Sequence, residues 1–198
     1  RELARRLGVP AEIVEFARVA EVVEALKAGR ADFTITNASP ARAEIVDFAP
    51  TVVALELGML ALPDSPVQAF DKLADLDRAG VRIGVSQGST SQGVLTRALQ
   101  QARVVPAPSL QAAGQLLQRR EIDAFATNKG ILFEMADRVP GARVLAGRWG
   151  LEQLAIAVPK GRGEGAAYLR GFTEAVAAQG LVRQAAARAG LRGLAEGK

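Results

Sequence analysis

The feature that most constrains the fold is a regular alternation of segments with strand periodicity and segments with helix periodicity. Phe33 and Ile35 alternate with threonines, the period of a strand, whereas residues 19–28 repeat apolar side chains at helical spacing. Further strands are expected at 11–16, 51–62, 81–86, 102–108, 122–127 and 154–159, and helices at 1–8, 68–76, 92–101, 109–119, 131–139, 164–178 and 181–190. The alternation predicts an α/β protein with largely parallel sheets.

The composition excludes several classes of function. The chain has no cysteine and no histidine, so Ser-His-Asp and Cys-His hydrolases, thiolate metal sites and disulfide frameworks are excluded. The formal charge of +4 comes from scattered basic residues, with seven Phe, one Trp and one Tyr, which argues against a nucleic-acid partner. No apolar run is long enough to span a membrane. We expect neither a metal nor another cofactor, and no enzymatic activity.

The stretch DFTITNASPAR places a positive charge where a helix disfavours it. Ser39 suits the N-cap and Pro40 the first helical position, which makes Arg42 the third residue of a helix. A positive charge there opposes the helix dipole. Two explanations remain open: an ion pair with Glu44 or Asp47, or a bidentate contact with the carboxylate of a ligand.

Polar side chains follow three of the expected strands. In open α/β sheets, ligands bind beyond the carboxyl ends of the strands, where hydroxyls and backbone N–H groups can hold an anion. The same residue types are ordinary helix caps, so each junction also has a purely structural explanation. The candidate ligand-binding residues of these junctions are Thr36, Asn37, Ser39, Ser89, Thr90 and Asn128.

Five blocks in order resemble bacterial family 3 extracellular solute-binding proteins. They are GRADFTITNASPARAEIVDFAP, VRIGVSQGSTSQ, SLQAAGQLLQRREIDAFATN, LAIAVPKG and FTEAVAAQGLVRQAAARAG, and together they cover nearly the whole chain. The resemblance implies a two-lobed fold of the periplasmic-binding-protein type (type II) with a ligand cleft between the lobes. Lobe one would comprise residues 1–55 and 153–198, and lobe two residues 56–152. The implied function is delivery of a small ligand, usually an amino acid, to the membrane permease of an ABC importer from the periplasm or a membrane-tethered, extracytoplasmic position.

The resemblance also assigns roles to the candidate residues. By position, Arg42 matches the arginine that binds the ligand's α-carboxylate, with Thr36, Asn37 and Ser39 beside it and Ser89 and Thr90 meeting the same group from lobe two. Asn128 stands where amino-acid binders usually have an aspartate for the α-ammonium group, and Lys129 adds a positive charge next to it. An ammonium group needs a carboxylate to offset its desolvation. The hypothesis is a carboxylate ligand without a free α-ammonium, or a zwitterion held in some other way.

A second departure from the family concerns the N-terminal strand. The chain begins RELARR, as expected of a processed or trimmed form, and nothing before Arg1 supplies the strand and the following aromatic with which the family normally begins. A lobe without that strand would expose sheet edges and favour self-association. Trp149 is expected either to cover the cleft or to belong to the core of lobe two. The alternatives are a ligand-sensing domain of a membrane receptor, a dehydratase-like enzyme on the same fold, and the effector domain of a transcription regulator.

Overall fold

The computed structural model describes residues 1–16, 19–161 and 163–195. Its contacts divide the chain into two compact units: unit 1 is Arg1–Val52 with Leu154–Ala185, and unit 2 is Val53–Gln153 with Ala186–Lys198. The helices are α1 (Glu2–Leu7), α2 (Val19–Lys27), α3 (Pro40–Ala43), the 3-10 turn η1 (Leu73–Leu76), α4 (Thr90–Ala98), α5 (Leu110–Gln118), α6 (Lys129–Ala136), α7 (Gly163–Ala178) and α8 (Leu181–Arg188). The strands are β1 (Thr34–Asn37), β2 (Val46–Ala61), β3 (Arg82–Ser86), β4 (Arg103–Ala107), β5 (Ala124–Asn128), β6 (Arg143–Val144) and β7 (Gly150–Pro159).

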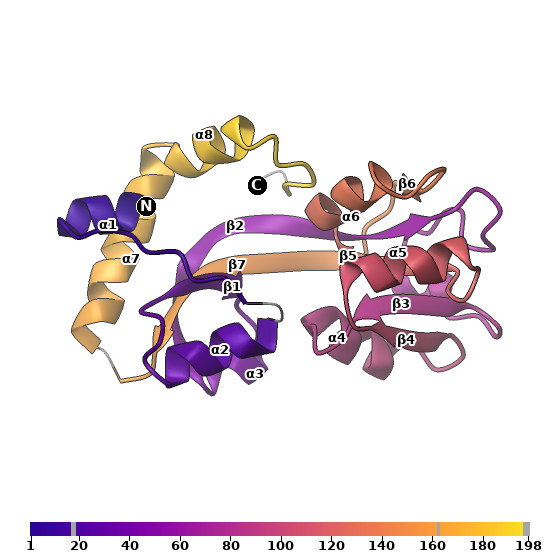
Figure 1. The fold of residues 1–198 in the computed structure, drawn as a ribbon, viewed down its shortest axis with the longest axis horizontal. Coiled ribbons are helices and arrows are strands. Elements are labelled where there is room, and N and C mark those ends of the chain that lie inside the picture. The colour runs from indigo at the N-terminus through magenta and orange to yellow at the C-terminus, as the bar shows by residue number, and fades with distance from the viewer. Residues whose placement is uncertain (17–18, 162, 196–198) are drawn as a thin grey trace. The chain divides into compact units, whose positions relative to one another are not determined.

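The sheet is mixed. Its strand order is β1-β7-β2-β5-β3-β4, with β6 also paired to β2. β3 is parallel to β4 and to β5, whereas the pairs β1–β7, β2–β5 and β2–β6 are antiparallel. The prediction of largely parallel sheets is therefore wrong outside β5-β3-β4. Alternation along the sequence does not fix strand direction, and the long strands β2 and β7, which each have residues in both units, are inserted between the others (Figure 1).

Unit 1 is built on the antiparallel pair β1–β7, in register from Thr34↔Ala157 to Asn37↔Leu154. Leu3 of α1 and Leu169 of α7 pack with Ile156 of β7, and Figure 1 shows α1 lying beside α7. The buried side chain of Leu26 on α2 packs against β2 and β7. β1 is thereby held with its carboxyl end leading into the loop before α3.

Two predicted elements are wrong. The strand expected at 11–16 is not formed, and Ile13 and Val14 in this segment are 69% and 50% exposed. Strand periodicity gives a strand only where a neighbouring strand accepts its backbone hydrogen bonds, and none of the described strands pairs with this segment. The helix expected at 68–76 is reduced to the single 3-10 turn η1.

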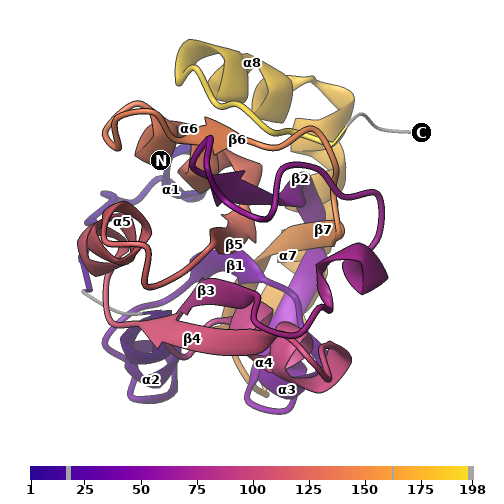
Figure 2. The same cartoon turned by 90° about the vertical axis from the view of Figure 1, so that its right-hand side faces the viewer.

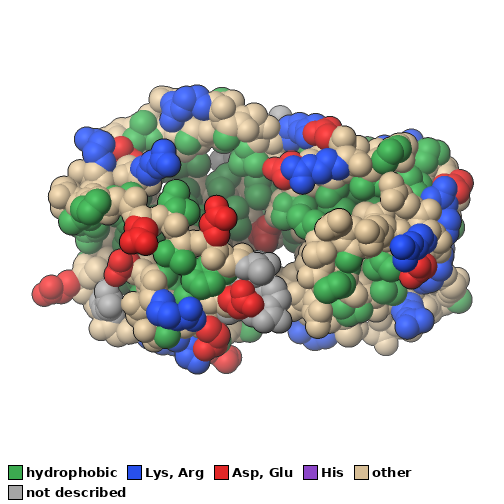
Figure 3. All heavy atoms as spheres, viewed as in Figure 1, with side chains coloured by type: hydrophobic (Ala, Val, Ile, Leu, Met, Phe, Trp, Pro, Cys, Tyr) green, Lys and Arg blue, Asp and Glu red, His purple; other side chains and the backbone are tan. Residues whose placement is uncertain are grey.

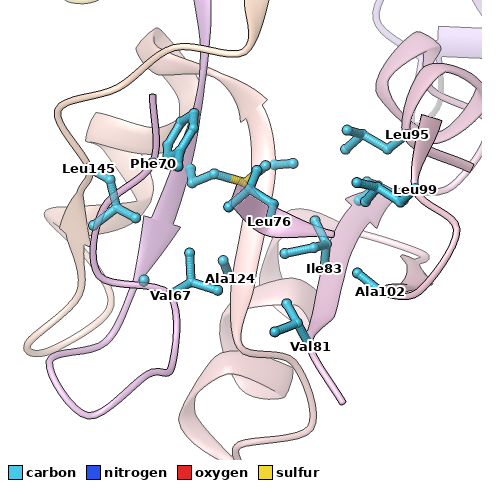
Figure 4. Close-up of a cluster of buried hydrophobic side chains, with 14 residues drawn as sticks. Val67, Phe70, Leu76, Val81, Ile83, Leu95, Leu99, Ala102, Ala124 and Leu145 are labelled. Atoms are coloured by element: carbon cyan, nitrogen blue, oxygen red, sulfur yellow. The ribbon is translucent and has the colours of Figure 1, made fainter. Parts of the chain in front are cut away.

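Unit 2 has apolar clusters on both faces of its sheet, because successive strand residues point to opposite sides. One cluster joins Ile83 of β3 to Leu95 of α4 and to Leu76, as Figure 4 shows. The other joins Phe125 of β5 to side chains of α5 and α6. Helices therefore cover both faces of β5-β3-β4 (Figure 2). Polar residues stand at the carboxyl ends of two of these strands, Ser86 on β3 and Asn128 on β5.

The compact units and the predicted lobes have different limits. The lobes, 1–55 with 153–198 and 56–152, stay a prediction. In the structure, the residues after Ala185 group with unit 2, because the last described residues pair with β2: Ala195 N–H donates to Ala54 O at 2.9 Å and Leu194 forms a bridge with Leu55. Basic and acidic side chains are interspersed on the face shown in Figure 3.

Candidate functional site

The loop between β1 and α3 has the predicted cap. Ser39 is the N-cap of α3 and its Oγ accepts a hydrogen bond from Arg42 N at 3.4 Å, with Pro40 at the first helical position. The helix, however, is a single turn of four residues. A macrodipole requires several aligned peptide units, so the clash of Arg42 with the helix dipole is weaker than the sequence argument assumed.

The Arg42 side chain is fixed by the loop itself. Its Nη1 donates to Thr36 Oγ1 at 2.8 Å and to Asn37 O at 3.3 Å. Among the ion pairs between described residues, none joins Arg42 to Glu44 or Asp47, and Asp47 instead accepts a hydrogen bond from Gly161 N. Unit 1 therefore brings together four predicted ligand residues, Thr36, Asn37, Ser39 and Arg42, with the guanidinium held in place in advance of any ligand.

Two further predicted residues lie at the polar edge of unit 2. Because β3 and β5 are parallel neighbours, the segments that follow them lie at the same edge of the sheet. Ser89 is the N-cap of α4, with its Oγ accepting from Gln92 N at 3.1 Å, and Thr90 is the first residue of that helix. Gly88 has a φ of 74°, a conformation that favours glycine, and its N–H donates to Gln92 Oε1.

Asn128 has two polar partners. Its Oδ1 accepts from Ile131 N at 3.0 Å and thereby caps α6, while its Nδ2 donates to Glu152 Oε2 at 2.8 Å. Glu152 lies on β7 within unit 2, is half-buried, and has no ion pair among the described residues. Sequence reasoning missed Glu152, because no local motif links it to Asn128; the available signal was its place beside the predicted lobe crossing.

Lys129 does not add an uncompensated charge next to Asn128. It is 8% exposed, and its Nζ donates to Glu56 Oε2 at 2.7 Å and to Ala146 O at 3.1 Å. The hydrogen bond from Lys129 holds the pKa of the Glu56 carboxyl below its ordinary value. The expectation of a positive charge offered beside Asn128 is therefore wrong, because that charge is paired inside unit 2.

Of the two roles expected for Trp149, covering the cleft or packing in a core, the structure shows the second. Its Nε1 donates to Gly58 O at 3.0 Å, and its ring packs against the apolar cluster of unit 2. A separate groove of about 400 Å³ lies between α5 and α6, and its lining includes none of the predicted ligand residues. Within the described residues no group of three acidic, histidine or cysteine side chains could hold a metal ion, and no helix is long and apolar enough to cross a membrane.

Unit 1 thus presents the guanidinium of Arg42 in the loop after β1. Unit 2 presents the hydroxyls of Ser89 and Thr90 after β3, and the carboxylate of Glu152 beside Asn128 at the end of β5. The pattern of bacterial extracellular solute-binding proteins, family 3, matches residues 1–188. The chain belongs to this family. The resemblance read from the sequence is confirmed, whereas a comparison with curated protein sequences gives no significant match.

Solved structures confirm the fold of this family member. A protein described as a binding component of an ABC transporter from Wolinella succinogenes, complexed with lysine, has a TM-score of 0.84 at 18% identity, over 95% of this chain and 82% of that one. An ancestral arginine-binding protein bound to arginine has a TM-score of 0.80 at 23% identity, over 94% and 83%. An ancestral amino-acid-binding protein, a precursor of cyclohexadienyl dehydratase, has a TM-score of 0.79 at 22% identity, over 94% and 80%. The predicted class, α/β of the two-lobed periplasmic binding type, is confirmed.

Proposed function

We propose that the protein is the extracytoplasmic solute-binding component of an ABC importer, and that its ligand is a small molecule with a carboxylate group, an amino acid or a related organic acid. The observation that carries the proposal is the Arg42 loop, in which Thr36 and Asn37 hold a half-buried guanidinium. A guanidinium can pair with a carboxylate through two parallel hydrogen bonds, which adds geometric selectivity to the charge. The family and the amino acids bound by the structural neighbours support the proposal.

The other predicted residues have matching roles. Ser39, Ser89 and Thr90 stand at helix starts, where a hydroxyl and backbone N–H groups favour an anionic group. Asn128 would orient a neighbouring acid, Glu152, through its Nδ2. No covalent step is required of any of these groups, so the proposed activity is binding.

The proposal is tested by calorimetric titration with the common L-amino acids and with their α-hydroxy and α-keto analogues. Binding of at least one carboxylate in the micromolar range or tighter is expected, and mass spectrometry of the purified protein would identify a retained compound. If no member of the panel binds a folded protein, the carboxylate proposal is wrong.

Glu152 supports an amino acid rather than a simple organic acid. Its Oε2 lies 2.8 Å from the Nδ2 of Asn128, the residue that stands where amino-acid binders usually have an aspartate. A carboxylate there supplies the negative charge that offsets the desolvation of an ammonium group. Of the two hypotheses from the sequence, the zwitterion held in another way is therefore the one we propose.

Glu152→Gln is expected to weaken binding of the best α-amino acid of the panel by about 30-fold, while binding of its α-hydroxy analogue changes little. Glutamine keeps a hydrogen-bond acceptor for Asn128 but removes the charge. Titration calorimetry of both ligands measures the difference. Glu134→Gln, an exposed acid on α6 that lines the separate groove, is the matched control. Equal losses for both ligands would contradict a role for Glu152 with the ammonium group.

Two other functions use the same fold. A sensor domain of a membrane receptor would bind the same ligand, and the sequence of the full gene distinguishes it by a signalling module. Two observations favour a dehydratase. One structural neighbour is a precursor of cyclohexadienyl dehydratase, and the carboxylate of Glu152 is a group that can serve as a general base. Incubation of cyclic hydroxy acids with the protein, followed by product analysis, tests this alternative; we expect no turnover.

The partners we propose are the membrane permease of the importer and, through β1, a second copy of the chain. β1 ends the described strand order, and Ile35 on it is 52% exposed. An unpaired strand edge with an apolar side chain invites pairing with another chain. Sedimentation velocity is expected to show concentration-dependent dimers that Ile35→Lys abolishes. A wild-type protein that stays monomeric at high concentration would exclude this association.

A further inference from the structure

The segment Leu191–Ala195, which we call the C-terminal clamp, joins β2 to the first turn of α6 within unit 2. We propose that this clamp is a positioning element of the candidate ligand site, because it fixes the start of α6 and with it Asn128. The inference rests on the proposed function for its effect on ligand affinity, and on the structure alone for its effect on α6.

The clamp is attached to β2 by backbone hydrogen bonds. Glu56 N–H donates to Gly193 O and Ala195 N–H donates to Ala54 O, both at 2.9 Å, and Leu194 forms an antiparallel bridge with Leu55. The clamp therefore adds a short strand-like contact to β2 next to Glu56.

The clamp also packs on α6 without any side chain between the two backbones. Gly193 has a φ of 78°, and a Cβ at this position would lie 2.5 Å from Lys129 Cβ and 2.9 Å from Gly130 N. A Cβ at Gly130 would lie 3.3 Å from Arg192 O and 3.2 Å from Asn128 Oδ1. Only glycine at 193 allows this approach, for reasons of space as well as of backbone conformation.

Two further contacts attach the clamp to the body of α6. Arg192 pairs with Asp137 at the end of the helix, and its guanidinium lies 4.8 Å from the centre of the Phe133 ring. The clamp thus contacts the first turn, the middle and the end of α6.

The clamp reaches the candidate site through Glu56 and Lys129. Gly193 O accepts from the backbone of Glu56, whose carboxylate binds Lys129, the first residue of α6. Lys129 follows Asn128, the N-cap of α6. The Oδ1 of Asn128 accepts a hydrogen bond from Ile131 N, and its Nδ2 donates one to Glu152. A displacement of the first turn of α6 therefore moves the Asn128 amide away from Glu152, and the geometry offered to a ligand changes.

The experiment compares Gly193→Ala with Gly190→Ala. Both glycines have a positive φ, 78° and 61°, but a Cβ at Gly190 meets no atom within 4 Å, so this control carries the backbone strain without the collision. L-arginine and L-lysine are the probes for titration calorimetry, and NMR hydrogen exchange of the Ile131 amide reports the cap of α6 independently of any ligand.

We expect Gly193→Ala to weaken binding of the probe at least tenfold and to speed exchange at Ile131 by a similar factor, whereas Gly190→Ala leaves both close to wild type. If the two variants behave alike, the clamp does not position the site. If neither probe binds the wild-type protein, arginine and lysine are not its ligands, the panel of the proposed function decides whether another carboxylate is, and the exchange rate at Ile131 still decides the inference.

A milder variant decides the case in which Gly193→Ala does not fold. Arg192→Ala removes the ion pair with Asp137 and the contact with Phe133, and we expect a few-fold faster exchange at Ile131 and a few-fold weaker binding of the probe. Arg188→Ala, at the end of α8, is the control. Wild-type exchange at Ile131 in Arg192→Ala would overturn the inference.

Discussion

Replacing Glu56 with alanine is expected to lower the free energy of unfolding by about 3 kcal/mol, since removal of one partner leaves the other charge buried without compensation. The Lys129 ammonium, in a side chain that is 10% exposed, would keep only Ala146 O as a hydrogen-bond partner. Its aliphatic chain is confined as well, because Gly58 and Gly193 both lie against it. Urea denaturation followed by circular dichroism measures the loss.

The double variant Glu56→Gln with Lys129→Met is the control for this prediction. It removes both charges and keeps similar volumes, so most of the stability is expected to return. Asp64→Ala breaks an exposed pair with Arg120 and is expected to have little effect, because water screens such pairs. A loss from Glu56→Ala as small as that from Asp64→Ala would show that Lys129 reaches water.

The same pair makes the stability depend on pH. The hydrogen bond from Lys129 lowers the pKa of Glu56 below its ordinary 4.5, so the folded state favours the charged carboxylate. The contribution of the pair is therefore complete above pH 4.5 and is lost as the pH falls through the lower folded-state pKa. The difference in unfolding free energy between wild type and Glu56→Ala is expected to shrink over this acidic range, and a constant difference would contradict the assignment.

The sequence predicted helix starts correctly where they depend only on residues within the same turn. The sequence placed Ser39, Ser89 and Asn128 at or near the starts of helices, and each is an N-cap whose side chain accepts a hydrogen bond from the backbone N–H three residues on. A cap is a contact within one turn, so residue type and position are enough to predict it. The order of five sequence blocks carried the resemblance to the family, and with it the two-lobed fold type.

Contacts between distant residues could not be predicted in this way. Lys129 and Glu56 are 73 positions apart, and nothing in the sequence around Lys129 indicates that its charge is paired. Asn128 and Glu152 lie on different strands, so no local sequence motif could predict that the Glu152 carboxylate lies beside the Asn128 amide. Strand direction and the unpaired segment 9–16 depend on which strands become neighbours, which is a property of the whole chain.

Replacing Arg42 with alanine is expected to weaken binding of the panel's best amino acid by at least 100-fold, about 3 kcal/mol, because a desolvated carboxylate would lose its charged partner. The free energy of unfolding is expected to fall by only about 1 kcal/mol, since α3 is a single turn and the variant loses the hydrogen bonds to Thr36 and Asn37 at a half-buried position. Calorimetry and urea denaturation of the same preparation give both numbers.

Arg42→Lys separates charge from geometry. Lysine keeps the positive charge but cannot form two parallel hydrogen bonds, so its affinity is expected to fall between that of Arg42→Ala and wild type. Arg170→Ala removes an exposed arginine of α7 in unit 1 and controls for the loss of a basic residue. A wild-type affinity in Arg42→Ala together with a large loss of stability would assign Arg42 to the structure of the loop. If Arg42→Lys binds the ligand as tightly as wild type, the ligand requires only the positive charge and not the two parallel hydrogen bonds.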